Sequence, residues 1–278
     1  YEFPKILSFL LFLVVLSILF TSIFQIPTDW DGMDYHLPPI IESWKNGFWA
    51  RSIEPYFAAR HYPKTQSLLA LWWIQHFGLL FGLRGVLLMP ALQWIVGCIC
   101  IRNLFPKNPW AIALWISYPL IAREATTYYV DSAGLITFLA TLTFAKEKKW
   151  LLTAIALGLH SSLKFTNLPT SVVLFLCIII WNFRSNISNH FKKILLLAIF
   201  PITFGAYQPV LNIFHEGKPF GVLKCEILGK DFCNGDLSPT DLVHAPIIPD
   251  YDKEDSWIKK ILTGFTPNKW IPTQDVNT

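Results

Sequence analysis

Charged residues are scarce in this chain of 278 residues: Asp, Glu, Lys and Arg make up 15% of it, whereas hydrophobic residues make up 53%. Soluble globular domains carry about 25% charged residues, so the composition argues against an ordinary soluble domain. The net charge of +4 is small and dispersed, which argues against nucleic-acid binding. We therefore expect an all-α polytopic membrane protein.

Cysteine is also scarce, with five residues. Cys98, Cys100 and Cys177 lie inside apolar runs, where a packing role is expected. Cys225 and Cys233 lie in a polar stretch, and both a disulfide and two free thiols fit them. A zinc site would need two further ligands at suitable spacing, and the sequence offers none.

No apolar run long enough to span a membrane follows residue 213. We expect residues 1–213 to form the transmembrane domain, with an outer loop at 27–65, and residues 214–278 to form an extracytoplasmic C-terminal segment. The chain starts without Met and ends on polar residues, which leaves open whether either end is the natural terminus. The apolar runs lie at about 6–26, 66–82, 85–101, 109–122, 132–145, 150–163, 167–183 and 194–213.

The stretch Thr28–Pro39 directly follows the first apolar run and is unusually polar. It holds Asp29, Asp31, Asp34 and His36 within eight residues. A carboxylate at the centre of a spanning helix costs about 2.5 to 3.5 kcal/mol. We therefore expect these groups at a wet membrane face, where they can meet a polar substrate.

The direction of each span depends on whether the run at 66–82 crosses the membrane. If it crosses completely, three basic clusters fall on the same side as Asp31 and opposite Lys5, against the positive-inside rule. If it lies along the outer interface, the clusters fall inside, and this is the arrangement we expect. The clusters contain eight residues: Arg102, Lys107, Lys146, Lys148, Lys149, Arg184, Lys192 and Lys193.

This choice has a consequence for function. It places Asp131, at the start of one apolar run, and Lys164, at the end of another, on the same outer face as Asp31. The rejected arrangement would separate Asp31 from Asp131 by the full bilayer.

The pattern Trp30-Asp31-x-x-x-Tyr35-His36-Leu37-Pro38 resembles the first outer loop of the GT-C superfamily. These integral-membrane glycosyltransferases use polyprenyl-phosphate sugars, and they include the protein mannosyltransferases and the lipid A aminoarabinose transferases. Other segments follow in the family's order and extend the resemblance to about residue 221. Arg60-His61-Tyr62-Pro63-Lys64 resembles the segment that contacts the lipid phosphate in relatives, and Tyr129–Ala133 resembles the second acidic motif. Gly158–Lys164 resembles the Gly-rich helix that ends in Lys, and Gly217–Gly221 weakly resembles the Asn-Pro-Phe-type turn after a later helix. Gly32 departs from the pattern, because many relatives carry a second acid there.

The resemblance implies a GT-C-like helical bundle with juxtamembrane helices in its outer loop. It also implies sugar transfer from a polyprenyl-phosphate donor to a lipid, glycan or protein acceptor. The expected location is a bacterial inner membrane, with the active site on the extracytoplasmic face.

Such a transfer needs a base for the acceptor hydroxyl and cations for the departing phosphate. Asp31 is the expected base of a single inverting displacement, and Asp34 and Asp131 complete the catalytic set. The expected substrate-binding residues are Tyr35, His36, Arg60, His61, Lys64 and Lys164. The sequence identifies no cofactor, and the three acids would be the ligands if a divalent metal is used.

Local structural explanations stay open for several of these residues. Asp31 and Asp131 also suit helix capping, and Lys164 suits snorkelling to lipid headgroups. Tyr128 fits an interfacial aromatic belt, and His160 fits a packed, hydrogen-bonded core. A short amphipathic helix is expected near 40–49.

The alternative function is a transporter or flippase that carries a lipid-linked glycan without catalysis. Transporters tend to place charges near the middle of the bilayer, in broken helices of repeated halves. Here the acidic groups cluster at one face and no internal repeat is visible, so the transferase is the favoured hypothesis.

Overall fold

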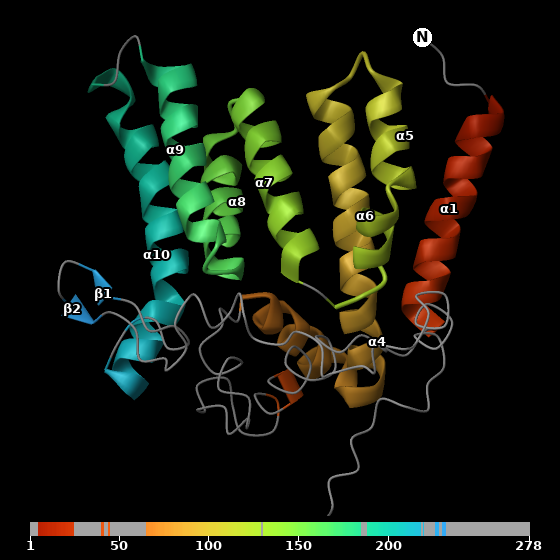
Figure 1. Ribbon diagram of the computed structural model, residues 1–278, viewed down its shortest axis with the longest axis horizontal. Helices are drawn as coiled ribbons and strands as arrows, with labels where there is room; N and C mark the ends of the chain where they lie inside the picture. The colour runs from red at the N-terminus through yellow and green to blue at the C-terminus, as the bar shows by residue number, and fades with distance from the viewer. Residues whose placement is uncertain are drawn as a thin grey trace, which may run out of the picture. The chain divides into compact units, whose positions relative to one another are not determined.

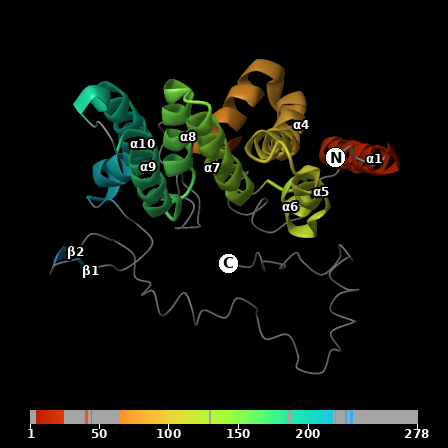
Figure 2. The same cartoon turned by 90° about the horizontal axis from the view of Figure 1, so that it is seen from above.

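The computed structural model describes residues 5–24, 40–41, 44, 65–128, 130–184, 188–217, 219, 226–227 and 230–231, and these are predominantly helical. Figures 1 and 2 show the helices side by side in a row that runs from α10 to α1. The helices are α1 (Lys5–Phe24), α4 (Thr65–Leu104), α5 (Pro109–Ser117), α6 (Pro119–Glu124), α7 (Val130–Lys146), α8 (Trp150–Leu163), α9 (Asn167–Phe183), η2 (Ser188–His190) and α10 (Phe191–Glu216). A small antiparallel hairpin follows, in which β1 (Glu226–Ile227) pairs with β2 (Lys230–Asp231).

Local sequence signals set several helix ends. The side chain of Asn108 accepts a hydrogen bond from the backbone N–H of Trp110, and Pro109 occupies the first helical turn of α5. Helix α10 ends at Glu216 and is followed by Gly217, which has a φ of 76°. Glycine is favoured there because a left-handed residue with a Cβ is strained.

Helix α4 bends sharply at Gly78, where φ is 72° and ψ is 170°. In a straight helix, Ile74 and Gly82 would lie about 12 Å apart along the axis. Here a Cβ added to Gly82 would lie 2.4 Å from the Cα of Ile74, so the chain folds back on itself. In Figure 1 the first part of α4 runs across the lower end of the bundle and the second part runs up through it. Residues 66–82 are therefore not a straight extension of the run at 85–101, and their predicted place at the outer interface stays a prediction.

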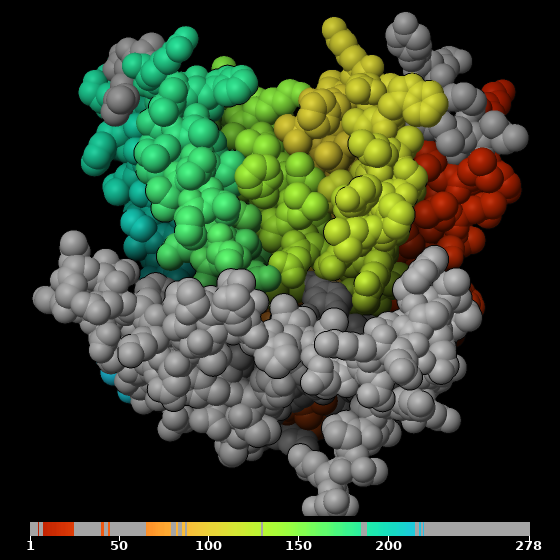
Figure 3. Space-filling model, in the orientation of Figure 1, coloured from red at the N-terminus to blue at the C-terminus, as the bar shows by residue number. Residues whose placement is uncertain are grey.

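Apolar side chains cover the outside of the bundle, and Figure 3 shows the outer surfaces of α1, α5, α7 and α9 on one face. Phe12 is 60% exposed, Trp181 86% and Phe214 81%. The interior is mainly apolar, with clusters around Trp94, Ile74 and Leu197. It also holds buried polar side chains, among them Thr141, Thr153, His160, Ser161, Ser162, Ser171, Gln208 and Asn212. In soluble proteins, large exposed apolar patches mark a binding or membrane surface.

One described segment, Ser188–Phe214, is both long and apolar enough to cross a bilayer. Four shorter apolar helices, of 10–17 residues, lie at Ser8–Phe24, Leu88–Leu104, Trp150–Leu163 and Asn167–Phe183. The prediction of a helical protein is therefore confirmed, apart from the small β1–β2 hairpin. The prediction that the chain crosses the membrane several times stays a prediction.

The eight basic residues of the three clusters gather at one end of the bundle. This is the end where α1 begins, where α4 leads into α5, where α7 leads into α8 and where α9 gives way to α10 (Figure 1). The opposite end holds Arg123, Glu124, Asp131 and Lys164, at the junctions of α6 with α7 and of α8 with α9. The predicted separation of the basic clusters from Asp131 is thus present in the fold.

Candidate functional site

Most of the predicted site residues lie outside the residues that the structure describes. These are Asp31, Asp34, Tyr35, His36, Arg60, His61 and Lys64. The two remaining predicted residues, Asp131 and Lys164, are described. They come from different helices and are 33 positions apart in the chain.

Asp131 and Lys164 form an ion pair, with 2.7 Å between Nζ of Lys164 and Oδ1 of Asp131. Asp131 lies in the first turn of α7, where a negative charge complements the helix dipole. Lys164 is the extended residue that follows α8, where a positive charge is favourable for the same reason. The two residues lie at the same end of the bundle, and their direct contact goes beyond what the sequence predicted.

This pair is poorly suited to stabilising the fold. The Asp131 side chain is 58% exposed and the Lys164 side chain 27% exposed. Ion pairs in such surroundings contribute about 0 to 1 kcal/mol, because water screens the charges and two long side chains lose freedom. Both groups remain accessible to a solute at this end of the bundle.

A small cavity of about 160 Å³ lies on one side of Asp131, among α4, α5, α6 and α7. Polar lining comes from Glu124, Asp131 and Ser132, and ring surface comes from Trp94 and Trp115. The indole N–H of Trp94 is buried and has no hydrogen-bond partner among the described residues. The lining is largely apolar, and the volume is close to that of an apolar cavity of about 150 Å³ that holds benzene.

A second cavity of about 630 Å³ lies among α4, α7, α8 and α10. Its lining is largely apolar and includes Leu159, Leu163 and Phe204, with Gln93 among the few polar residues. The buried Oε1 of Gln93 makes no hydrogen bond within the described part of the chain. A mostly apolar cavity of this size with a few polar groups is typical of a site for an amphipathic small molecule.

The first turns of α7 separate the two cavities. Ser132 and Ile136 line the small cavity, whereas Ala133 and Thr137 line the large one. At about 100° per residue, these two pairs point to different sides of the helix. Asp131, paired with Lys164, lies in the first turn of α7 and lines the small cavity.

Two contacts connect this site to the predicted motifs that precede α4. Thr65, the first described residue after Lys64, lines the large cavity together with Leu163. Ile40 is fully buried in one cluster with Tyr128, three positions before Asp131.

Tyr128 corrects one expectation from the sequence. It is 1% exposed, so it is not part of an exposed aromatic belt. Its hydroxyl donates a hydrogen bond to the backbone oxygen of Gln66, at 3.2 Å, and joins the α6–α7 link to the start of α4. Burial raises the pKa of Tyr128 above its ordinary value, because the ionised form would lose its hydration.

His160 confirms the packed-core expectation. It is 4% exposed, and its ring nitrogens lie 3.0 Å from the backbone oxygen of Gly134 and 2.9 Å from Oγ1 of Thr170. These contacts join α8 to α7 and α9. The buried ring therefore holds the helices that carry Asp131 and Lys164.

Sequence reasoning missed Trp94, Gln93 and Gln66 as lining residues of the two cavities. Each lies in an apolar helical pattern that by itself indicates packing. Their place in a cavity wall appears only when the helices are assembled.

The described residues contain no group of three or more His, Cys, Asp or Glu side chains arranged to hold a metal ion. Asp131 is the single described member of the predicted metal-ligand set, and Asp31 and Asp34 lie outside the described part of the chain.

Comparison of the chain with models of protein families, with curated protein sequences and with solved structures finds no match. The functional argument therefore depends on the sequence motifs and on the geometry of this site.

Proposed function

We propose that this chain is a polytopic membrane glycosyltransferase that transfers a sugar from a polyprenyl-phosphate donor to an acceptor at the end of the bundle that holds Asp131. The observation that carries the proposal is the Asp131–Lys164 pair with a cavity on each side of α7. A donor of this class has three parts: a polar ring, a phosphate and a long apolar chain. The site offers a matching environment for each part.

The small cavity suits the sugar ring. Carboxylate oxygens of Glu124 and Asp131 accept hydrogen bonds from hydroxyl groups, and the Trp94 N–H can donate one to a ring or hydroxyl oxygen. The faces of Trp94 and Trp115 supply apolar surface for the carbon side of the ring. The large cavity suits the first units of the prenyl chain.

The phosphate would lie between these two parts, within reach of Lys164. A lysine ammonium carries three donors and binds phosphate oxygens as a compact charge. On this proposal the phosphate competes with Asp131 for Lys164, and Arg60 and Lys64 add further positive charge. Neutralising the departing phosphate lowers the free energy of the transition state, in which negative charge develops on the leaving oxygen.

The proton of the acceptor hydroxyl needs a base on the opposite side of the sugar ring from the phosphate. Asp31 is our candidate for that base. Its motif leads to Ile40, which packs with Tyr128 near the start of α7. Asp131 then has the second role of holding sugar hydroxyls and orienting Lys164.

A membrane setting is supported by the many exposed apolar side chains on the outside of the bundle. The apolar exterior described above would be covered by lipid, and small polar residues would join the helices inside the bundle. The gathering of eight basic residues at one end fits the positive-inside rule, with the site at the opposite face.

The experiment is transfer from radiolabelled undecaprenyl-phosphate hexose by the purified full chain in lipid vesicles, with an envelope extract as the source of acceptors. We expect release of undecaprenyl phosphate by the wild type and its loss in Asp31→Asn, while donor binding is retained. Glu147→Gln, a carboxylate change at the other end, is the matched control. Turnover at the wild-type rate in Asp31→Asn would remove Asp31 from the mechanism.

The same vesicles distinguish a lipid-linked glycan carrier from a transferase. A carrier would move the labelled donor to the other leaflet without releasing undecaprenyl phosphate. Release without movement supports the transferase, and movement without release would overturn it.

A further inference from the structure

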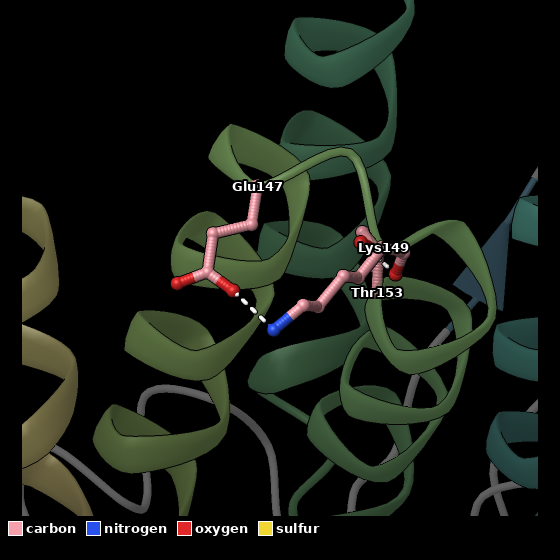
Figure 4. A network of polar contacts seen from close by, with 3 residues as sticks. All are labelled: Glu147, Lys149 and Thr153. Carbon is pink, nitrogen blue, oxygen red and sulfur yellow. Dashed lines mark hydrogen bonds and ion pairs between the residues drawn. The ribbon is translucent and has the colours of Figure 1, made fainter.

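The end of the bundle opposite the candidate site carries eight basic residues, and we name this set the basic end: Arg102, Lys107, Lys146, Lys148, Lys149, Arg184, Lys192 and Lys193. All eight are exposed. Among the described residues of this end the one acid is Glu147, whose Oε2 lies 2.7 Å from Nζ of Lys149 (Figure 4). Most of the positive charge of the basic end is therefore uncompensated within the described part of the chain.

Two contacts join these cations into one surface. Nζ of Lys146 donates hydrogen bonds to the backbone oxygens of Asn103 and Leu104, at 2.8 and 3.0 Å, so the α7–α8 turn touches the α4–α5 turn. Nζ of Lys193 lies 6.0 Å from the ring centre of Trp150, which brings the start of α10 to the start of α8. The basic end is thus assembled from three separate chain segments.

Lys148 adds a positive charge at a position where its backbone is strained. Its φ is 58°, and it is the single non-glycine residue with a positive φ in the described part of the chain. Left-handed backbone strains a residue that has a Cβ and is relieved by glycine or asparagine. A lysine at this exposed turn accepts the strain and adds a charge that makes no ion pair with a described residue.

Exposed aromatic side chains accompany the cations. Trp110 is 64% exposed, Phe105 52%, Trp181 86% and Phe191 62%, and each lies at or near the same end. Aromatic rings beside Lys and Arg are typical of the membrane interface, where rings sit at headgroup depth and cations meet lipid phosphates. The helices that carry three of these rings also expose Leu114, Ile180 and Leu195, so the combination favours a lipid interface over an acidic protein or a nucleic acid.

We propose that the basic end binds the headgroups of anionic phospholipids in the leaflet that it faces, with Lys107, Lys148 and Lys192 as the principal free cations. The proposal rests on the membrane setting of the proposed function but not on sugar transfer. A chain without transferase activity would still show the lipid preference, so the two proposals fail independently.

The test uses the purified full chain in mixed micelles with brominated phosphatidylglycerol or brominated phosphatidylcholine, and it follows quenching of tryptophan fluorescence. We expect the anionic lipid to bind more tightly than the zwitterionic lipid. Each cation near an anionic surface contributes about a fivefold preference. Lys148→Gly should therefore lower the preference about fivefold, and the triple variant Lys107→Gln, Lys148→Gly, Lys192→Gln should lower it roughly 100-fold, because three such factors multiply.

Two controls keep the result interpretable. Arg123→Gln removes one exposed cation at the opposite end and should leave the preference unchanged. Lys148→Gly relieves the left-handed backbone, so its melting temperature should not fall, and misfolding is not then an explanation for lost binding. An equal response to both lipids, or a triple variant that keeps the wild-type preference, would overturn the proposal.

Discussion

Replacing Lys164 by methionine removes the ammonium while it keeps an unbranched apolar stem. The structure indicates that folding will hardly change, because the Lys164–Asp131 pair is 27% and 58% exposed. Pairs of that kind contribute about 0 to 1 kcal/mol to stability. In a domain of 150 to 250 residues, 1 kcal/mol corresponds to a shift in melting temperature of about 2 to 4 °C, which sets the upper limit that we expect.

Donor binding should respond much more strongly. A hydrogen bond to a charged group is worth about 1.5 to 3 kcal/mol, which corresponds to a loss of roughly 10-fold to 150-fold in affinity for undecaprenyl phosphate. The contrast between a small change in stability and a large change in binding is the signature of a ligand-binding lysine. A lysine that only ties α8 to α7 would show the reverse.

The assay measures the Kd for undecaprenyl phosphate and the melting temperature on the same preparations of wild type, Lys164→Met and Asp131→Asn. Asp131→Asn frees Lys164 from its carboxylate partner, so it should keep or increase affinity for the phosphate while it impairs transfer. Lys193→Met, at the opposite end, controls for loss of one cation. If Lys164→Met bound the phosphate as tightly as the wild type, or lost more than about 4 °C, the assignment of Lys164 to the phosphate would be wrong.

Three further predictions follow from other parts of the fold. Gly82→Ala should lower the free energy of unfolding by about 1 to 3 kcal/mol, because the new Cβ would overlap the backbone of Ile74; an unchanged denaturant midpoint would contradict the bend in α4. Tyr128 has a raised pKa in the folded state, so the unfolded state ionises first as the pH rises past about 10. The contribution of Tyr128 to the free energy of unfolding should be constant below that pH and then fall by up to about 1.4 kcal/mol per pH unit. Urea titrations at several pH values should show this fall for the wild type and not for Tyr128→Phe. The same pH dependence in both proteins would refute the prediction. In a cysteine-free background, Thr127→Cys should react in intact cells with an impermeant thiol reagent and Lys148→Cys only after lysis; the opposite pattern would reverse the orientation.

The site itself combines residues that differ in how visible they are in the sequence. Asp131 and Lys164 stand out because they are charges at the ends of apolar runs, and chain continuity across spans of alternating direction placed them at one end. Their direct contact was not predictable, because helices of similar apolar pattern can pack with many neighbours. Trp94 and Gln93 were invisible as site residues, since an aromatic or amide inside an apolar run has the same pattern whether it fills a core or lines a cavity.

The sequence by itself determined that the chain is helical, where several helices begin and end, and that the basic clusters lie opposite Asp131. These properties follow from local composition. Apolar runs are buried or face lipid, Asn108-Pro109 and Gly217 set helix ends, and each turn reverses the chain. Only the tertiary structure decided that α4 folds back at Gly78, that Tyr128 is buried against Gln66 and that cavities flank α7. Those features depend on the shape of contacts between segments far apart in the chain, and side-chain periodicity carries no information about them.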